Sequence, residues 1–177
     1  MSSVIFLVDH SAGKISKAAG ELATYAKSIG ESVAVIFADN AEQIASQLNA
    51  FSVDKVITVA GEWDKYGAPA IAEGLAQIVA AKNPAAVLIT STATGKEIAA
   101  RVSVITGSGI ITDAVSVDKE LITTQSVFGG STTVHSTVTK GVPVITLRAN
   151  SIEAIPATST PVIESFAATI SDAATLA

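Results

Sequence analysis

Residues Ser91–Gly95 combine serine, threonine and glycine in front of a lysine, a composition that suits a phosphate-binding loop. Such loops hold phosphate with the backbone N–H groups at the start of a helix. The phosphate loop of nucleoside triphosphatases also needs a glycine five positions before its second glycine, and a serine or threonine after its lysine. Thr90 and Glu97 occupy those two positions here. The segment therefore lacks that loop, and its last residues are predicted to cap a helix that begins at Thr94.

A second glycine pair, in Gly107-Ser108-Gly109, invites comparison with dinucleotide-binding loops. Those loops carry a third glycine and follow the first strand of a βαβ unit. Here the third glycine is missing, and the pair follows an expected helix. The two glycines are therefore predicted to end that helix and to lead into the next strand.

Histidine chemistry depends on His10 and His135, since the chain has only 2 histidines. His10 follows an apolar run and so lies at the strand end where open α/β sheets bind ligands. His135 lies in a threonine-rich run, which favours a solvated or interface position. A metal site or a Ser-His-Asp arrangement would need folding to bring carboxylates or a serine to one of these histidines, and catalysis by either is not favoured. We therefore predict no catalytic residue and no metal site.

Four further side chains have both a structural and a functional interpretation. Asp113 is expected to be an edge or turn carboxylate held by backbone amides, in preference to a ligand-positioning or domain-contact acid. Arg101 suits an ion pair and a partner surface equally well. Trp63 and Tyr66 follow a predicted strand, where loop packing is favoured over an aromatic interface.

Apolar runs separated by helical segments supply the elements that position these residues. The helical segments repeat apolar residues every three or four positions, and Asp39 with Glu42 has the spacing of a capping box. The pattern predicts a three-layer α/β fold with a parallel sheet flanked by helices. The predicted strands are Val4–Val8, Val33–Phe37, Val56–Val59 and Val87–Thr90.

The carboxyl ends of these parallel strands meet at one edge of the sheet, where a crevice for a nucleotide is usual. Backbone N–H groups at the start of the helix after Thr90 could receive a phosphate there, although Asp9 and Asp39 would oppose it. The candidate crevice residues are His10, Asp39, Ser91, Thr92, Thr94 and Gly95.

The pattern changes after Gly109. Residues 110–150 contain β-branched runs separated by hairpin-type turns, which predict a small antiparallel β extension whose last strand can rejoin the main sheet. Residues 151–177 are rich in Ser, Thr, Ala and Pro, as expected for an arm or interdomain segment. The predicted organisation is one α/β domain over 1–150, with a parallel core over 1–109, followed by this segment.

Composition excludes several classes of protein. A net charge of -5 with only 11 basic residues argues against nucleic-acid binding. The absence of cysteine excludes disulfides and thiol chemistry within the chain and fits a cytoplasmic location. No apolar run approaches the roughly 20 residues of a membrane helix, so we expect no membrane insertion.

Several stretches together resemble the N-terminal domain of the alpha subunit of electron-transfer flavoproteins. Their order and spacing across residues 4–148 carry the resemblance, although Ala100 and Ala149 stand where that family often has proline. The matching stretches are Val4–Val8, Asp9–Lys14 with Glu21-Leu22 downstream, Thr94–Val102, Gly109–Asp113, Val127–Gly130 and Val144–Arg148.

The resemblance implies a nucleotide-binding fold of the adenine-nucleotide-alpha-hydrolase-like type and an FAD-containing heterodimer with a beta subunit. Such heterodimers accept electrons from flavin dehydrogenases, including those of fatty acid oxidation, and pass them towards the membrane quinone pool. The family's AMP site lies in the beta subunit. Its FAD-binding residues lie in a second alpha domain, so no FAD ligand is assigned to this chain, which alone is expected to bind no flavin.

Two other classes compete with the expected role, which is a non-catalytic scaffold that docks a partner. A nucleotide-binding module of the universal-stress type usually has a Gly-x₂-Gly run and a later Gly-Ser/Thr pair, which Ser91–Gly95 does not supply. A hydrolase would need a nucleophile elbow and a base, and the sequence offers neither.

Overall fold

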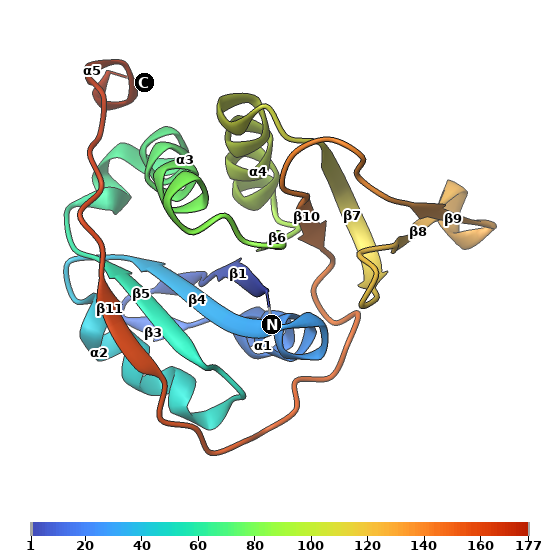
Figure 1. Ribbon diagram of the computed structural model, residues 1–177, viewed down its shortest axis with the longest axis horizontal. Helices are drawn as coiled ribbons and strands as arrows, with labels where there is room; N and C mark the ends of the chain where they lie inside the picture. The colour runs from blue at the N-terminus through green and yellow to red at the C-terminus, as the bar shows by residue number, and fades with distance from the viewer. Residues whose placement is uncertain (1, 177) are drawn as a thin grey trace.

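One nine-stranded sheet, flanked by helices, organises residues 2–176, which are the residues that the structure describes (Figure 1). This computed structural model gives the strand order β11-β5-β4-β1-β6-β10-β7-β8-β9. Strands from β11 to β7 are parallel, and β8 and β9 continue the sheet antiparallel. The strands are β1 Ser3–Leu7, β4 Glu31–Phe37, β5 Lys55–Val59, β6 Ala86–Thr90, β7 Ile110–Val117, β8 Thr123–Val127, β9 Thr132–Ser136, β10 Val144–Leu147 and β11 Val162–Ser165.

Helices cover both faces of the parallel part, which explains the continuous apolar runs in the sequence. Val4 and Phe6 of β1 pack in the layer that contains α1 and α2, while Ile5 and Leu7 pack in the layer of α3 and α4. The predicted three-layer α/β fold is thereby confirmed. No helix within residues 2–176 is long and apolar enough to cross a membrane. The helices are α1 Lys17–Ile29, α2 Ala41–Ala45, α3 Trp63–Lys82, α4 Ala93–Thr106 and α5 Asp172–Thr175, with short 3₁₀ turns η1 Ser46–Ala50 and η2 Phe128–Gly130.

Two helix starts differ from the sequence-based expectation. Helix α4 begins one residue earlier than predicted, and its cap is Thr92 instead of Thr94, because Thr92 Oγ1 accepts a hydrogen bond from the Gly95 N–H at 2.9 Å. Helix α2 follows Asn40, whose side chain makes no capping bond, so the expected cap by Asp39 does not form. Of these two helix starts, only that of α4 has a side-chain cap.

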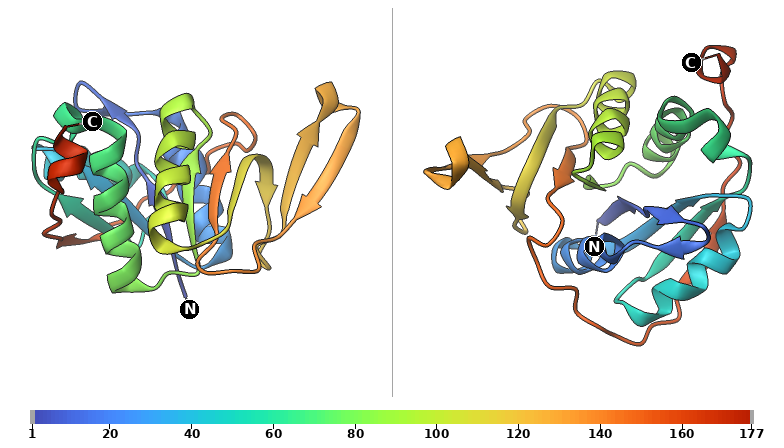
Figure 2. Two further views of the ribbon diagram at one scale, coloured as in Figure 1. Left: turned by 90° about the horizontal axis from the view of Figure 1, so that it is seen from above. Right: turned by 180° about the vertical axis from the view of Figure 1, so that it is seen from behind.

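Strand β10 lies inside the sheet, between β6 and β7 and parallel to both. The antiparallel part is therefore shorter than the 110–150 range suggests, and consists of the later half of β7 with β8 and β9. Seen from above, β8 and β9 form a two-stranded ribbon that projects away from the body (Figure 2). A separate small hairpin, β2 (His10–Ser11) with β3 (Lys14–Ile15), lies at the end of β1.

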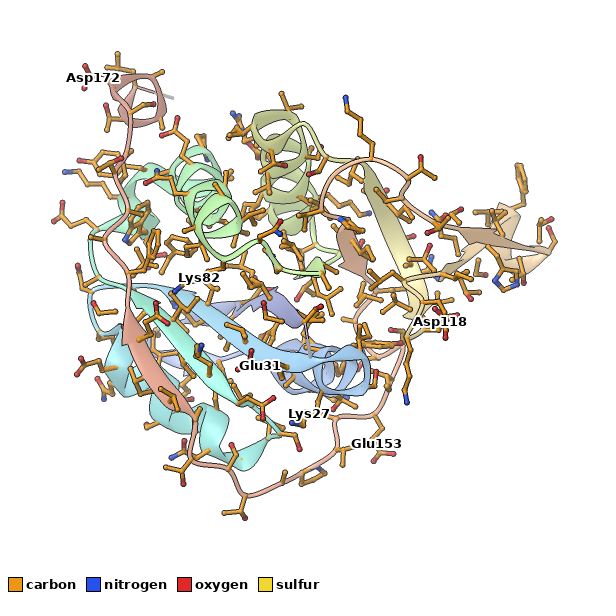
Figure 3. The ribbon with its side chains drawn as sticks, in the orientation of Figure 1. Lys27, Glu31, Lys82, Asp118, Glu153 and Asp172 are labelled. Atoms are coloured by element: carbon orange, nitrogen blue, oxygen red, sulfur yellow. The ribbon has the colours of Figure 1, made fainter. Side chains whose placement is uncertain are left out.

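Residues 148–176, which follow β10, wrap around the domain and are called the belt here. It first passes α1, where the Asn150 N–H donates to Glu21 Oε2 at 2.8 Å. It then forms β11 along the edge of β5 and reaches α3 on the other face (Figure 1). Lys82 of α3, labelled in Figure 3, pairs with Glu164 of β11. The belt therefore connects both helical layers and covers the β5 edge of the sheet.

Candidate functional site

The predicted crevice at the carboxyl ends of the strands holds some of its expected residues together and separates others. His10 and Thr94 line one small cavity, together with Asp9 and Asp64. Asp39 is exposed and is not part of its wall. The binding of a ligand by this crevice remains a prediction.

The cavity is small and acidic. Its volume is about 160 Å³, whereas sites for drug-sized ligands usually have about 300–1,000 Å³. Burial raises the pKa of Asp9, an effect that the Thr90 hydroxyl and the His10 ring oppose. The His10 ring is held in place by a hydrogen bond from Nε2 to the Phe37 carbonyl at 3.0 Å. Two carboxyl groups beside so little space disfavour a nucleotide, because its phosphates would be repelled.

Gly95 and Thr92 support the start of α4 instead of a phosphate. A Cβ on residue 95 would lie 2.0 Å from the Thr90 carbonyl oxygen, so only glycine lets the first turn of α4 approach the end of β6 this closely. The Thr92 hydroxyl accepts the Gly95 N–H, one of the groups that a phosphate would otherwise use. The segment that looked like a phosphate cradle is thus a capped and tightly packed helix start.

Ser91 belongs to a different cluster, on the β7 side of the sheet. Its hydroxyl donates to Asp113 Oδ1 at 3.3 Å and accepts from Thr146 Oγ1 at 3.0 Å. Arg148 also binds Asp113, through Nη2 to Oδ2 at 2.6 Å and Nε to Oδ1 at 3.3 Å. The Arg148 guanidinium, by hydrogen bond and charge, holds the pKa of Asp113 below its usual value. Asp113 is therefore held by side chains, and not by backbone amides as the sequence suggested.

The Asp113 backbone explains why these side chains meet. Between Ile145 and Leu147 the pairing of β10 with β7 shifts by one residue, so β7 contains a bulge. Asp113 lies in this bulge with a φ of 60°, a left-handed conformation that costs a non-glycine residue free energy. Bulges bend a strand and increase its twist. This one lies where β7 leaves the parallel sheet and begins to pair with β8.

Two cavities larger than the crevice lie elsewhere, on the α3–α4 face. A groove of about 810 Å³ runs between the two helices, and a neighbouring hollow has about 430 Å³. The belt forms part of both walls, through Thr169–Ser171 in the first and Ala173-Ala174 in the second. The wall of the larger groove contains no lysine or arginine, so it offers no charge partner for a phosphate.

The remaining candidate residues serve packing or surface pairing. Trp63 is buried at 2 % exposure, and its ring meets Phe37 edge-on with centroids 4.9 Å apart. Arg101 pairs with Glu97 on the same exposed helix face at 2.9 Å. His135 is exposed on β9, with Nδ1 3.3 Å from the Thr124 hydroxyl. Within residues 2–176, no three His, Asp or Glu side chains are arranged to bind a metal ion.

Sequence reasoning missed the Asp113–Arg148 pair as a unit. Both residues lie within stretches that carry the family resemblance, but they are 35 positions apart, and the sequence did not fix the place in the sheet of the strand that precedes Arg148. The sequence signal for this pair was an aspartate within one β-branched run and an arginine at the end of a later β-branched run.

Comparison with known proteins agrees with this architecture. Residues 4–171 match the electron transfer flavoprotein domain. The chain is 37% identical over 160 residues to an electron transfer flavoprotein subunit alpha of Mycobacterium tuberculosis, covering 89% of this chain and 50% of that protein. The corresponding protein of Mycobacterium leprae is 34% identical over the same length, with the same coverage. That of Bacillus subtilis is 26% identical over 129 residues, which are 71% of this chain and 40% of its own length.

The chain thus spans about half the length of the curated mycobacterial relatives that it matches. The match extends from β1 beyond β11, so it includes the parallel core, the projecting ribbon and most of the belt. The chain belongs to the electron transfer flavoprotein family and corresponds to the N-terminal domain of its alpha subunit.

Proposed function

We propose that this chain is the scaffold and partner-docking part of an electron-transfer flavoprotein, in which it binds a beta subunit. The observation that carries the proposal is the match to alpha subunits along 89% of the chain. The projecting β8–β9 ribbon supports it, because a ribbon that packs on little of its own chain is suited to contact another one.

The complete heterodimer carries FAD, which supplies the electron chemistry when bound. Within residues 2–176, neither the cavity beside Asp9 nor the α3–α4 groove fits that cofactor. The cavity beside Asp9 holds about 160 Å³, far too little for a dinucleotide. The α3–α4 groove is large enough but has no cation in its wall for a pyrophosphate. We therefore assign no flavin contact and no electron-transfer step to these residues.

In this proposal the chain has no catalytic activity of its own. The heterodimer takes electrons from flavin dehydrogenases, such as those that oxidise acyl-CoA, and passes them towards the respiratory chain. The chain's part is to hold the beta subunit and to position the flavin-binding part relative to it. Its proposed location is the cytoplasm, which the absence of cysteine supports.

Co-expression with the beta subunit from the same organism tests the proposal. We expect a one-to-one complex on size-exclusion chromatography with light scattering. The chain purified alone should show no visible flavin absorbance. Two monomeric proteins at micromolar concentration would contradict the docking role, and stoichiometric flavin on the isolated chain would contradict the cofactor assignment.

Calorimetric titration with AMP and with ATP separates this proposal from a stand-alone nucleotide-binding module. The acidic cavity and the occupied helix cap predict no heat of binding. Micromolar affinity for either nucleotide would favour the nucleotide-binding module instead.

A further inference from the structure

The outer edge of the projecting ribbon has no strand beside it. Strand β9 is the last in the sheet order and pairs only with β8, through five residue pairs from Val127↔Thr132 to Thr123↔Ser136. Residues 132–135 are exposed, and the ribbon points away from the body in every view (Figure 2). The backbone N–H and C=O groups on the outer side of β9 thus have no ladder partner among residues 2–176. An edge of this kind is a template for another strand.

The ribbon also lacks the charges that normally keep such an edge free. Residues 121–139 contain no Asp, Glu, Lys or Arg, in a chain with 27 such residues (11 basic and 16 acidic). The flanking charged residues, Glu120 and Lys140, lie at its two ends. Asp118, labelled in Figure 3, lies in the turn before β8, and its carboxylate is used there by the N–H groups of Glu120 and Ile122. Natural sheet edges usually carry lysine, proline or inward charges that prevent pairing, and β9 has none of these.

The tip of the ribbon presents an aromatic side chain in a strained conformation. Phe128 is 83% exposed and has a φ of 51°, in the left-handed region that non-glycine residues rarely adopt. Gly129 and Gly130 follow with positive φ values of their own. An exposed phenylalanine there contributes little to the stability of this chain and its backbone conformation costs free energy. The arrangement suits an anchor that enters a recess on another protein.

The opposite side of the same sheet shows how this fold covers the outer strand of its core. There the outer strand of the core, β5, is covered by β11 from the belt, in parallel pairing from Val162↔Lys55 to Ser165↔Thr58. The chain thus covers one edge with a short strand of its own, and no part of residues 2–176 reaches the other. A strand supplied by another protein would pair with the β9 edge in the same way that β11 pairs with β5.

We propose that the beta subunit adds a strand to the free edge of β9 and receives Phe128 in an apolar recess. This inference rests on the proposed function and specifies the contact through which the two subunits join. Because the edge carries no charge, the paired strand and its neighbourhood should be uncharged and rich in β-branched residues. The bulge at Asp113 lies where the later half of β7 turns from pairing with β10 to pairing with β8, and so directs the ribbon away from the parallel part of the sheet towards the partner.

Two variants of the ribbon, each with a matched control, test the inference in complexes with the beta subunit. Val134→Lys places a charge on the edge strand, and its control is Val162→Lys on the exposed strand β11 of the opposite edge. Phe128→Asn removes the aromatic ring, while asparagine tolerates the left-handed conformation and keeps the turn. Its control is Ile155→Asn, a change of another exposed apolar side chain, on the belt.

We expect Val134→Lys and Phe128→Asn each to weaken binding of the beta subunit by about tenfold or more in calorimetry, while both controls bind like the unaltered chain. Phe128→Asn should melt at the same temperature as the unaltered chain or higher, which separates lost contact from lost folding. In the complex, alternate backbone amides of residues 132–136 should exchange with deuterium more slowly than in the free chain.

Unchanged affinity in both ribbon variants, with no new amide protection over 132–136, would overturn this inference and leave the proposed function intact. A complete failure of the unaltered chain to bind the beta subunit would overturn both. Concentration-dependent dimers of the chain that Val134→Lys abolishes would show that a second copy occupies the edge, and would overturn the choice of partner.

Discussion

Arg148 Nη2 donates to Asp113 Oδ2 at 2.6 Å, joining the end of β10 to the bulge of β7. The Arg148 N–H also donates to the Ala114 carbonyl at 2.8 Å, so backbone and side chain hold the same point. Beyond it, β7 pairs with β8 and no longer with β10. The pair therefore holds the point at which the parallel part of the sheet ends and the antiparallel ribbon begins.

This pair should make stability depend on pH at the acid end. The Arg148 hydrogen bond lowers the pKa of Asp113 in the folded chain below the unfolded value of about 3.9. The pair therefore stabilises the fold above that unfolded value, and its contribution is lost as the pH falls through the folded pKa. Both side chains are more than a third exposed, so solvent screening should keep the effect small.

Urea unfolding of the unaltered chain and of Arg148→Gln measures this effect. We expect Arg148→Gln to be slightly less stable at pH 7 and the difference to shrink below about pH 4. Arg101→Gln is the control, because it changes the net charge equally but affects only a pair within α4. A stability difference that grows on acidification would contradict the assignment.

Gly95→Ala should be among the more costly changes of a single methyl group in this chain. The new Cβ would lie 2.0 Å from the Thr90 carbonyl oxygen, so α4 would have to move away from β6. We expect a loss of about 2–3 kcal/mol in the free energy of unfolding, as in other overpacked sites. Gly107→Ala is the control: it meets no atom within 4 Å but sits at a φ of 66°, which should cost about 1–2 kcal/mol. An equal or smaller loss for Gly95→Ala would show that the close approach is not required.

Glu73→Ala should release the end of the belt from α3. Glu73 accepts both the Ser171 N–H, at 2.8 Å, and the Ser171 hydroxyl, at 2.6 Å. One turn later, Gln77 exchanges hydrogen bonds with the backbone of Thr169 at 2.7 and 3.0 Å. Without Glu73, amide exchange at Ala174 should accelerate by about tenfold, with a change in global stability of about 0.5 kcal/mol or less.

Glu97→Ala on α4 is the matched control for the belt, because the Glu97 carboxylate pairs with Arg101 and not with the belt. Hydrogen exchange with mass spectrometry follows both variants. Unchanged protection of residues 169–175 in Glu73→Ala would show that the apolar contacts of Ile170 and Ala174 hold the belt by themselves.

Trp63→Ala should destabilise the fold strongly, because Trp63 is 2 % exposed and packs on Phe37. Truncating a buried aromatic residue costs about 3–5 kcal/mol. Trp63→Phe keeps most of the apolar area and loses only the hydrogen bond from Nε1 to the Ala60 carbonyl at 3.2 Å, so it should cost much less. Chemical unfolding followed by circular dichroism compares the two. If Trp63→Ala lowered the free energy of unfolding by less than about 1 kcal/mol, as a surface substitution does, the burial of this ring would be contradicted.

The sequence was sufficient for the parallel core because that information is local. A run such as Val4–Val8 is apolar at every position, which only a strand covered on both faces requires, and the observed strand spans Ser3–Leu7. The family was also recognisable, because its stretches recur in order along the chain. The predicted crevice was only partly right for a related reason. The sequence locates the ends of the strands, but it does not give the positions of the side chains around them.

Contacts between distant segments decided the strand order, the belt and the side-chain pairs that the sequence did not reveal. Val162–Ser165 becomes a strand only because the edge of β5 offers unpaired backbone groups, which nothing in a Ser/Thr/Pro-rich segment reveals. Trp63 looked like a loop residue and is buried because Phe37 lies across the sheet end from it. The sequence by itself determined the strands and helices of the parallel core, since apolar periodicity is a property of neighbouring residues. Only the tertiary structure decided that Asp113 meets Arg148 and that β9 is left with a free edge, because strand order depends on which distant strands satisfy one another's hydrogen bonds.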